Sequence, residues 1–282
     1  KVALVSLAAR PKSERQNRGA PNPEASFEQV FGTNTISMYA LAAQRHMYEF
    51  GTTSEQLAWV KVAASTHAQY NPHAFLQKVV TVEDVVNSRL LSSPLHLLDT
   101  CVVTDGGGAI VIVNPEIAKS LGKTRVKILG CAEAPKHSNN GKIDLTYTGG
   151  RFSGPRAFEE AGVTPADVKY ASIYDSFTIT VVETLEDLGF CEKGQGGKFV
   201  ADGNLISGQG KLPINTDGGG LCNNHPGMGG MMKILEGVRQ MQGTAHPAVQ
   251  VKNCDIALVH GTGGSLGTRM GSSTVILGHE DA

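Results

Sequence analysis

Short apolar runs alternate with helical stripes of apolar residues along most of the chain, which is the pattern of an α/β protein. Runs bounded by glycine-rich or polar segments predict strands. The first of them, Lys1–Leu7, has no polar face, so we expect a strand that is buried on both sides. The other strands are expected at residues 101–105, 109–113, 128–130, 168–173, 249–259 and 273–277.

Helical periodicity and capping residues predict the helices. Gly51 is expected to end the first helix, and Thr53 with Gln56 has the spacing of a capping box for the second. A long polar excursion rich in proline and glycine is expected at residues 8–36. The helices are expected at residues 37–50, from 53 onward, and at 81–88, 114–121, 155–161, 164–167, 178–188 and 231–242.

Two segments share one pattern. Residues 97–113 and 255–277 each read as strand, glycine turn, strand, and Gly106, Gly107 and Gly108 form the first of these turns. The likeness indicates an internal duplication with a mixed sheet in each half.

Composition and charge narrow the class of protein. The chain has 282 residues, 40% of them hydrophobic and 18% charged, which fits a globular protein with a sizeable core. A net charge of -1 gives no electrostatic reason to expect nucleic acid or an anionic membrane as a partner. No apolar run reaches the roughly 18 residues that a membrane span needs, and no signal peptide precedes the first strand. The absence of an initiating methionine before that strand predicts that the true N-terminus lies further upstream.

The five cysteines are scattered and form no CxxC pair. This favours a reducing cytoplasm over a disulfide framework, and it gives no zinc site. The pairs His67/His73 and Asp99/Asp105 also lack a metal-ligand context. A lysine-containing glycine loop at residues 194–199 follows a helix and lacks the Ser or Thr of a phosphate loop. We therefore expect no metal and no nucleotide motif.

The run from Asp217 to Gly230 is the richest in chemistry, because it places His225 among six glycines directly before a helix. Such glycine density marks backbone in unusual conformations or close to a ligand. The positive end of the following helix disfavours imidazolium, which suits a general base. A glycine-rich turn that His225 merely caps is the alternative.

Two further polar loops follow predicted strands, at residues 174–177 and 260–264. Because ligands in α/β sheets lie beyond the carboxyl ends of strands, all three loops are site candidates. Each has a structural alternative. Tyr174 can be a core-edge tyrosine, Ser176 a helix cap and His260 a hydrogen-bonded turn residue.

Several ordered motifs resemble the thiolase superfamily, and above all its sterol-carrier-protein-type and archaeal branch. The likeness runs through nearly the whole chain. Its motifs are Tyr39–Met47, Glu49–Ala58, His67-Ala68 with Asn71-Pro72, Leu98–Gly107, Tyr174–Thr178, Glu186–Gly189 and Asn224-His225-Pro226. The resemblance implies a five-layered αβαβα thiolase fold built from two similar halves with mixed sheets. We place the halves at residues 1–122 and 123–282.

The resemblance also implies acyl-CoA substrates, with coenzyme A as a substrate rather than a resident cofactor, and Claisen-type carbon–carbon chemistry. His225 matches the histidine that activates a nucleophilic cysteine, which in relatives lies upstream of the first residue here. Tyr174 and Ser176 match the next motif, in which relatives carry an oxyanion-hole residue and an acid/base cysteine. His260 is expected to supply the second acid/base role. Gly227, Gly263 and Gly264 are expected to contact the acyl-CoA through their backbone.

Departures from the family pattern keep three functions open. The serine hydroxyl of Ser176 is too weak an acid to replace a thiol, whereas the phenol of Tyr174 can act as an acid/base. The first function is a thiolase-like acyltransferase in which His225 activates the upstream cysteine. The second is a thiolase-fold retro-aldolase on a β-hydroxyacyl-CoA, such as a steroid side-chain intermediate, that uses Tyr174. The third is a non-catalytic acyl-CoA or lipid carrier. We expect at least a homodimer and, as relatives suggest, a second subunit with a zinc ribbon and an OB-fold.

Overall fold

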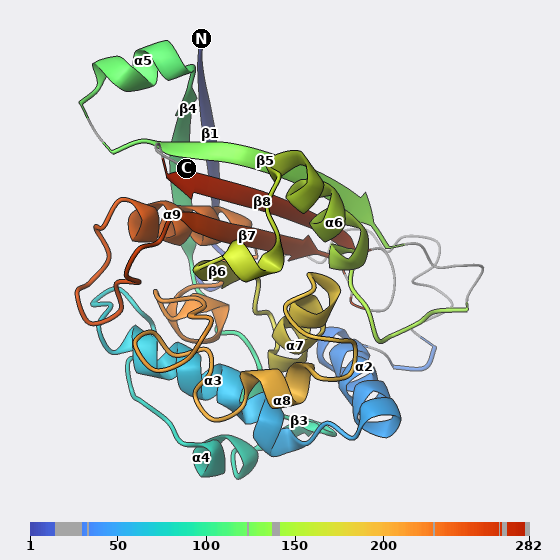
Figure 1. The fold of residues 1–282 in the computed structure, drawn as a ribbon. Coiled ribbons are helices and arrows are strands. Elements are labelled where there is room, and N and C mark those ends of the chain that lie inside the picture. Colours follow the sequence, from blue (N-terminus) through green and yellow to red (C-terminus); the bar gives the residue numbers. More distant parts are fainter. Residues whose placement is uncertain are drawn as a thin grey trace.

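The structure is a computed structural model of the chain, and Figure 1 shows its fold. It describes residues 1–14, 30–32, 34–122, 124–136, 142–227, 229–264, 266 and 270–279. Most of the polar excursion predicted at residues 8–36 lies outside these residues.

The described residues form a mixed set of helices and strands, as the sequence predicts. The strands are β1 (Val2–Ala9), β2 (Leu90–Ser92), β3 (Leu95–His96), β4 (Gly106–Val113), β5 (Val126–Pro135), β6 (Tyr170–Ile173), β7 (Ile256–Gly263) and β8 (Gly271–His279). The α-helices are α2 (Thr35–Phe50), α3 (Ser54–Ala68), α4 (Val82–Val86), α5 (Pro115–Ser120), α6 (Gly150–Ala161), α7 (Thr178–Asp187), α8 (Gly196–Val200) and α9 (Gly230–Met241). Short 3₁₀ turns span Leu97–Asp99 and Pro165–Asp167, and a π-helical turn spans Gly219–Asn223.

A four-stranded mixed sheet organises the fold, in the order β5-β8-β7-β6. Strands β6 and β7 are parallel, with Ile173 opposite His260, whereas β8 is antiparallel to both β7 and β5. Helix α9 covers one face of this sheet, and α6 and α7 cover the other (Figure 1). Helix α3 packs against α7 and α8, and ten of its residues are buried because neighbours enclose it. The result is a layered α/β arrangement.

Capping residues set the helix ends where the sequence predicts them. Gly51 adopts φ 72° as the C-cap of α2, a left-handed conformation that glycine adopts readily. Thr53 caps α3, and its side chain accepts a hydrogen bond from the backbone N–H of Gln56. The Gln56 side chain accepts one from the Thr53 N–H in return, which completes the capping box.

Strand β1 forms as predicted, but its predicted burial is wrong. It pairs only with β4, in a two-stranded ribbon that extends away from the large sheet (Figure 1). Val2 and Leu4 are 63% and 69% exposed because, among the described residues, no second layer covers the part of the ribbon where they lie.

The predicted glycine turn at residues 106–108 is also wrong, since these glycines are part of β4. They pair with residues 7–9 of β1. A Cβ on Gly108 would stand 2.7 Å from Leu235 of α9, so glycine is needed there for a close helix–strand approach. Strand β7 begins at Ile256 rather than at residue 249. The duplicated pattern therefore holds for β7 and β8, while the first copy is an irregular segment followed by one strand.

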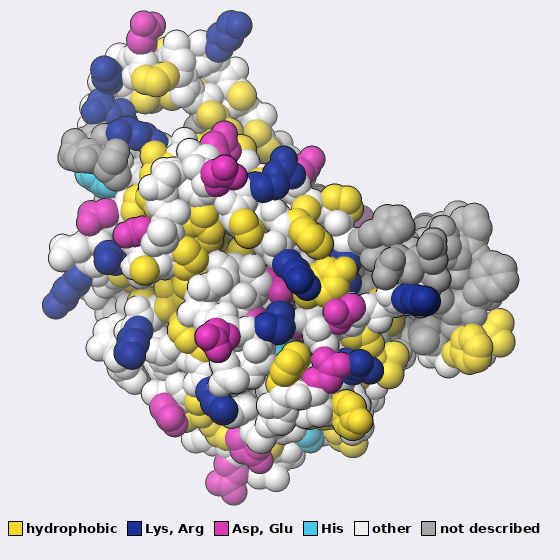
Figure 2. Space-filling view, turned by 45° about the vertical axis from the view of Figure 1, so that its right-hand side comes forward, with side chains coloured by type: hydrophobic (Ala, Val, Ile, Leu, Met, Phe, Trp, Pro, Cys, Tyr) yellow, Lys and Arg dark blue, Asp and Glu magenta, His cyan; other side chains and the backbone are white. Residues whose placement is uncertain are grey.

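Charges of both signs are interspersed on the face that Figure 2 shows, without a broad area of one sign. This distribution agrees with the net charge of -1. Among the described residues, no helix combines the length and apolar character that crossing a membrane requires.

Candidate functional site

The first part of the site lies at the carboxyl ends of β6 and β7. Tyr174 follows the last residue of β6, and its backbone N–H donates a hydrogen bond of 2.9 Å to the carbonyl of His260 in β7. Because the two strands are parallel, their carboxyl ends meet at the same edge of the sheet. Tyr174 and the residues that end β7 are therefore neighbours, as the sequence predicts.

The second part is the turn that carries His225. Gly218, with φ 97°, leads into the π-helical turn Gly219–Asn223, and Asn224 and His225 follow before α9 begins. The His225 N–H donates a 3.0 Å hydrogen bond to the hydroxyl of Thr104. Thr104 thus fixes the turn from a distant part of the chain.

The side chains of Tyr174 and His225 meet. The Tyr174 hydroxyl lies 2.8 Å from Nε2 of His225, and the tautomer of the imidazole decides which of the two donates the hydrogen bond. The rings meet edge to face, with centroids 5.3 Å apart. Gly229 allows this approach, since a Cβ there would stand 3.0 Å from the Tyr174 ring. The two residues lie 51 positions apart in sequence, so the fold itself brings them together.

Both members of this pair are neutral near pH 7. Burial lowers the pKa of His225, an effect that the Asp175 carboxylate opposes and the Lys233 ammonium reinforces. The sequence also predicts a neutral imidazole, but from the positive end of the following helix, whereas burial is the largest cause of the lowered pKa of His225. Burial also raises the pKa of the Tyr174 phenol well above its ordinary value. A neutral imidazole can accept a proton and a neutral phenol can donate one, so the pair can move protons.

The structure does not bring the ring of His260 to this pair. His260 is fully buried within β7, where its Nδ1 lies 2.9 Å from the Thr274 hydroxyl. Its ring faces α6, because a Cβ on Gly150 would stand 3.2 Å from its Cε1. Burial lowers its pKa to about 3. Only the backbone carbonyl of His260 reaches Tyr174, because the strand runs on to Gly263 instead of opening into a loop at His260.

The remaining predicted residues are Ser176, two positions after Tyr174, and three glycines. The Ser176 hydroxyl is buried and lies 3.2 Å from the hydroxyl of Thr180 in the first turn of α7. Gly227 is exposed, with φ 83°, two positions after His225. Gly263 ends β7 and Gly264 follows with φ 90°, and both are exposed. These glycines present backbone toward solvent near the edge of the sheet.

Two cysteines lie close to the site, and the position of Cys101 was not expected from the sequence. Its N–H donates to the carbonyl of Ser176 at 2.9 Å. Burial raises its pKa to about 12, and the Asp175 carboxylate adds to this rise. Cys222 is fully buried on the π-helical turn, and burial raises its pKa as well. Neither thiol ionises readily at neutral pH, so neither resembles an activated nucleophile.

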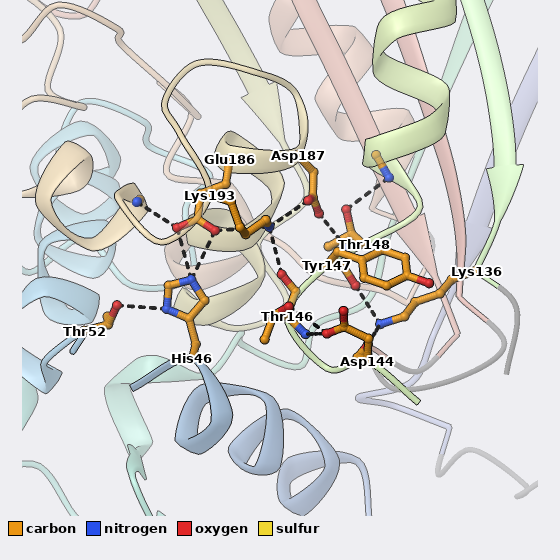
Figure 3. A network of polar contacts seen from close by, with 12 residues as sticks. His46, Thr52, Lys136, Asp144, Thr146, Tyr147, Thr148, Glu186, Asp187 and Lys193 are labelled. Carbon is orange, nitrogen blue, oxygen red and sulfur yellow. Dashed lines mark hydrogen bonds and ion pairs between the residues drawn. The ribbon is translucent and has the colours of Figure 1, made fainter. Parts of the chain in front are cut away.

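Sequence reasoning also missed a buried network of charges at the C-terminal end of α7 (Figure 3). His46 lies 3.0 Å from Glu186 and 2.8 Å from Thr52. Lys193 bridges Glu186 at 3.1 Å and Asp187 at 2.7 Å. The network ties α2 to the end of α7. Its partners lie up to 140 positions apart, which leaves no local sequence signal.

Neither a metal site nor a surface hollow gives a better candidate for the site. The described residues contain no group of three or more His, Cys, Asp or Glu side chains that could hold a metal ion. A surface hollow of about 490 Å³ lies between α2 and residues 142–145. Arg45 and Glu49 line it, but none of the predicted site residues does. Chemistry and position therefore favour the Tyr174–His225 pair over the hollow.

Comparison with known proteins identifies the class. A family model described as "Thiolase C-terminal domain-like" matches residues 132–279. A solved structure of the Ltp2-ChsH2(DUF35) aldolase is 35% identical, with a TM-score of 0.88 over 99% of this chain and 72% of that one. The chain belongs to the thiolase family and has a thiolase-like α/β fold.

The similar proteins include both a thiolase subunit and an aldolase. The benzoylsuccinyl-CoA thiolase subunit BbsB of Thauera aromatica is 38% identical over 253 residues, which is 87% of this chain and 64% of that protein. The steroid side-chain-cleaving aldolase of Thermomonospora curvata is 38% identical over 239 residues, which is 82% of this chain and 60% of that protein. The chain thus spans less than two thirds of the length of these relatives.

Proposed function

We propose that the protein makes or breaks a carbon–carbon bond in an acyl-CoA substrate. The contact between the Tyr174 hydroxyl and Nε2 of His225 carries this proposal, because it gives the chain a proton-transfer pair at the sheet edge. Gly263 and Gly264, exposed at the same edge, offer backbone N–H groups to the acyl oxygen. Coenzyme A takes part as a substrate.

The first form of this chemistry is that of a thiolase-like acyltransferase. His225 takes the proton from a cysteine thiol, the thiolate attacks the thioester carbonyl, and coenzyme A leaves with that proton as the acyl group moves to the cysteine. A second acyl-CoA then loses a Cα proton to the Tyr174–His225 pair and attacks the acyl carbonyl, so that the carbon–carbon bond forms and the cysteine leaves and regains the proton. Because burial raises the pKa of both Cys101 and Cys222, we assign the nucleophile to a cysteine outside this chain segment. The similarity to a thiolase subunit supports this form.

The second form is a retro-aldol cleavage of a β-hydroxyacyl-CoA, which the position of the Tyr174 hydroxyl favours. The Tyr174–His225 pair removes the proton of the substrate's β-hydroxyl, and the Cα–Cβ bond breaks as the carbonyl forms. The electron pair passes to the thioester enolate, which a proton from the pair then converts to the shortened acyl-CoA. The similarity to two aldolases supports this form.

Assembly is part of the proposal. We infer at least a homodimer, together with a second subunit that carries a zinc ribbon and an OB-fold. The solved aldolase, named as a complex of two proteins, supports the second subunit. Light scattering of the full-length protein at micromolar concentration would contradict the dimer if it showed an active monomer.

The test uses the full-length protein with any subunit that copurifies with it. Incubation with acyl-CoA followed by mass spectrometry is expected to show either an acyl adduct on a cysteine or carbon–carbon cleavage without an adduct. The first result assigns the thiolase form and the second the aldolase form. Stoichiometric binding without turnover, unchanged in His225→Ala, would overturn both forms in favour of a carrier.

His225→Ala is expected to lower turnover by roughly 10²–10⁴, the usual contribution of a general base. The matched control is His246→Ala, because His246 also packs its ring against a tyrosine, Tyr70, with centroids 5.1 Å apart. The control should keep its activity. A loss of less than tenfold in His225→Ala, with the same thermal unfolding midpoint as the control, would assign His225 a structural role only.

A further inference from the structure

The carboxylate of Asp175 joins three elements around the proposed site. Asp175 directly follows Tyr174, and its side chain is buried. Its Oδ1 accepts a 2.8 Å hydrogen bond from the Gly220 N–H, and its Oδ2 accepts one of 3.1 Å from the Leu221 N–H. The ammonium of Lys233 in α9 donates to Oδ1 at 2.6 Å. One side chain therefore binds the end of β6, the π-helical turn and α9.

These contacts enclose His225 on both sides along the chain. Leu221 precedes it and Lys233 follows it, and both are fixed to the same carboxylate. Tyr174, the partner of His225, is the residue before Asp175. The position of each ring in the 2.8 Å contact thus depends on Asp175.

The backbone of Gly220 lies between the Asp175 carboxylate and the His225 imidazole. A Cβ on Gly220 would stand 3.1 Å from Oδ1 of Asp175 and 3.1 Å from Cδ2 of His225, so these two atoms are no more than about 6 Å apart. At that distance, inside the protein, a charge acts strongly on the imidazole.

Burying the charges of the Lys233–Asp175 ion pair costs free energy. The side chains of Lys233 and Asp175 are 3% and 1% exposed. A buried ion pair commonly stabilises a fold no better than apolar residues of the same volume. A role in the proposed site gives a reason for a buried ion pair at Asp175 and Lys233. We propose that Asp175 and Lys233 are positioning residues that hold His225 against Tyr174, a role that rests on the proposed function of that pair.

The pH dependence of the site follows from the same geometry. Burial lowers the pKa of His225, Asp175 counteracts this lowering, and Lys233 adds to it. Other ionisable groups surround this region and stay unchanged in the test below. They are Tyr174 and Tyr39, Cys101, Lys61 in α3, and Cys222 and Asp217 in the turn itself.

The experiment measures the His225 imidazole directly in the full-length protein, by NMR titration of ¹³C-labelled histidine. The His225→Ala variant assigns the signal. Asp175→Asn is expected to move the titration to lower pH by about one unit, a tenfold change in proton affinity. Lys233→Met is expected to move it to higher pH, and Lys233→Arg to restore the wild-type position. The acid limb of kcat/KM should move with the titration.

The matched control is Glu186→Gln, which removes a buried, ion-paired carboxylate from the network of Figure 3. It should lower stability without moving the His225 titration. Titrations that stay in place, or that move the same way in Asp175→Asn and Lys233→Met, would overturn the proposal. If Asp175→Asn does not fold, the two Lys233 variants decide alone. Shifted titrations without turnover on any acyl-CoA would instead contradict the proposed function and leave the positioning role intact.

Discussion

His260 should make the folded protein sensitive to acid, although it lies away from the proposed proton-transfer pair. The residue is fully buried, its Nε2 has no hydrogen-bond partner among the described residues, and burial lowers its pKa to about 3. In the unfolded chain a histidine has a pKa of about 6.5. Between these two values the proton binds only to the unfolded chain, so acidification favours unfolding.

The size of the effect follows from the two pKa values. Each pH unit between them costs about 1.4 kcal/mol of unfolding free energy. From about pH 7.5 to about pH 4.5, His260 alone should therefore remove about 2.7 kcal/mol. Burial also lowers the pKa of His67 to about 4, but His67 is unchanged in the comparison below and its contribution cancels.

The comparison is between the wild type and His260→Asn, whose amide can still meet the Thr274 hydroxyl. Urea unfolding at a series of pH values gives the free energy of each protein. The variant is expected to be less stable at neutral pH, because the smaller side chain leaves a cavity. Its stability should also fall less steeply with acid, by the amount given above. Parallel stability curves for the two proteins would refute the reasoning.

Two further predictions test the packing and the site. Gly130→Ala should lower the unfolding free energy by about 2 kcal/mol in urea titration, because its Cβ would stand 2.3 Å from the carbonyl oxygen of Ala157 in α6. Gly271→Ala is the control, because no atom of the described residues lies within 4 Å of its Cβ, and equal losses would contradict this account. Tyr174→Phe should lower turnover by roughly 10²–10³ if the hydroxyl stabilises an oxyanion, and nearly abolish carbon–carbon cleavage if it is the aldolase acid/base. The control, Tyr170→Phe, removes the hydroxyl of a buried tyrosine outside the proposed pair, so steady-state assays should show little change.

Local signals account for the parts of the fold that the sequence predicts. The Thr53 capping box and the helix stop at Gly51 act over a few residues, so they can be recognised without tertiary contacts. The same holds for Tyr174 at the end of an apolar strand and for His225 before an amphipathic helix. The thiolase-like fold and the family, which the motifs indicate, are confirmed by the comparisons. The division into halves at residue 122 stays a prediction.

The features that sequence reasoning missed depend on distant partners. The glycines at residues 106–108 predict a turn from sequence alone, whereas pairing with β1 makes them part of strand β4. The ladder with β8 likewise carries β7 through Gly263, and strand alternation then turns His260 toward α6. The ion pair of Lys233 with Asp175 spans 58 positions, and no periodicity reveals it. The exposure of β1 depends on the absence of a covering layer among the described residues.

Besides Asp175, several residues from early parts of the chain hold the turn that carries His225. Thr104 lies 121 positions before it, while Val102 donates its backbone N–H to Gly220 and Phe75 donates its own to Asn223. Closing such long loops costs entropy before any contact forms, whereas α2 and α3 need only local contacts. In a refolding reaction, the helical signal should therefore return early. The geometry of the reactive pair should appear only when residues 75–104 have met the turn that carries His225.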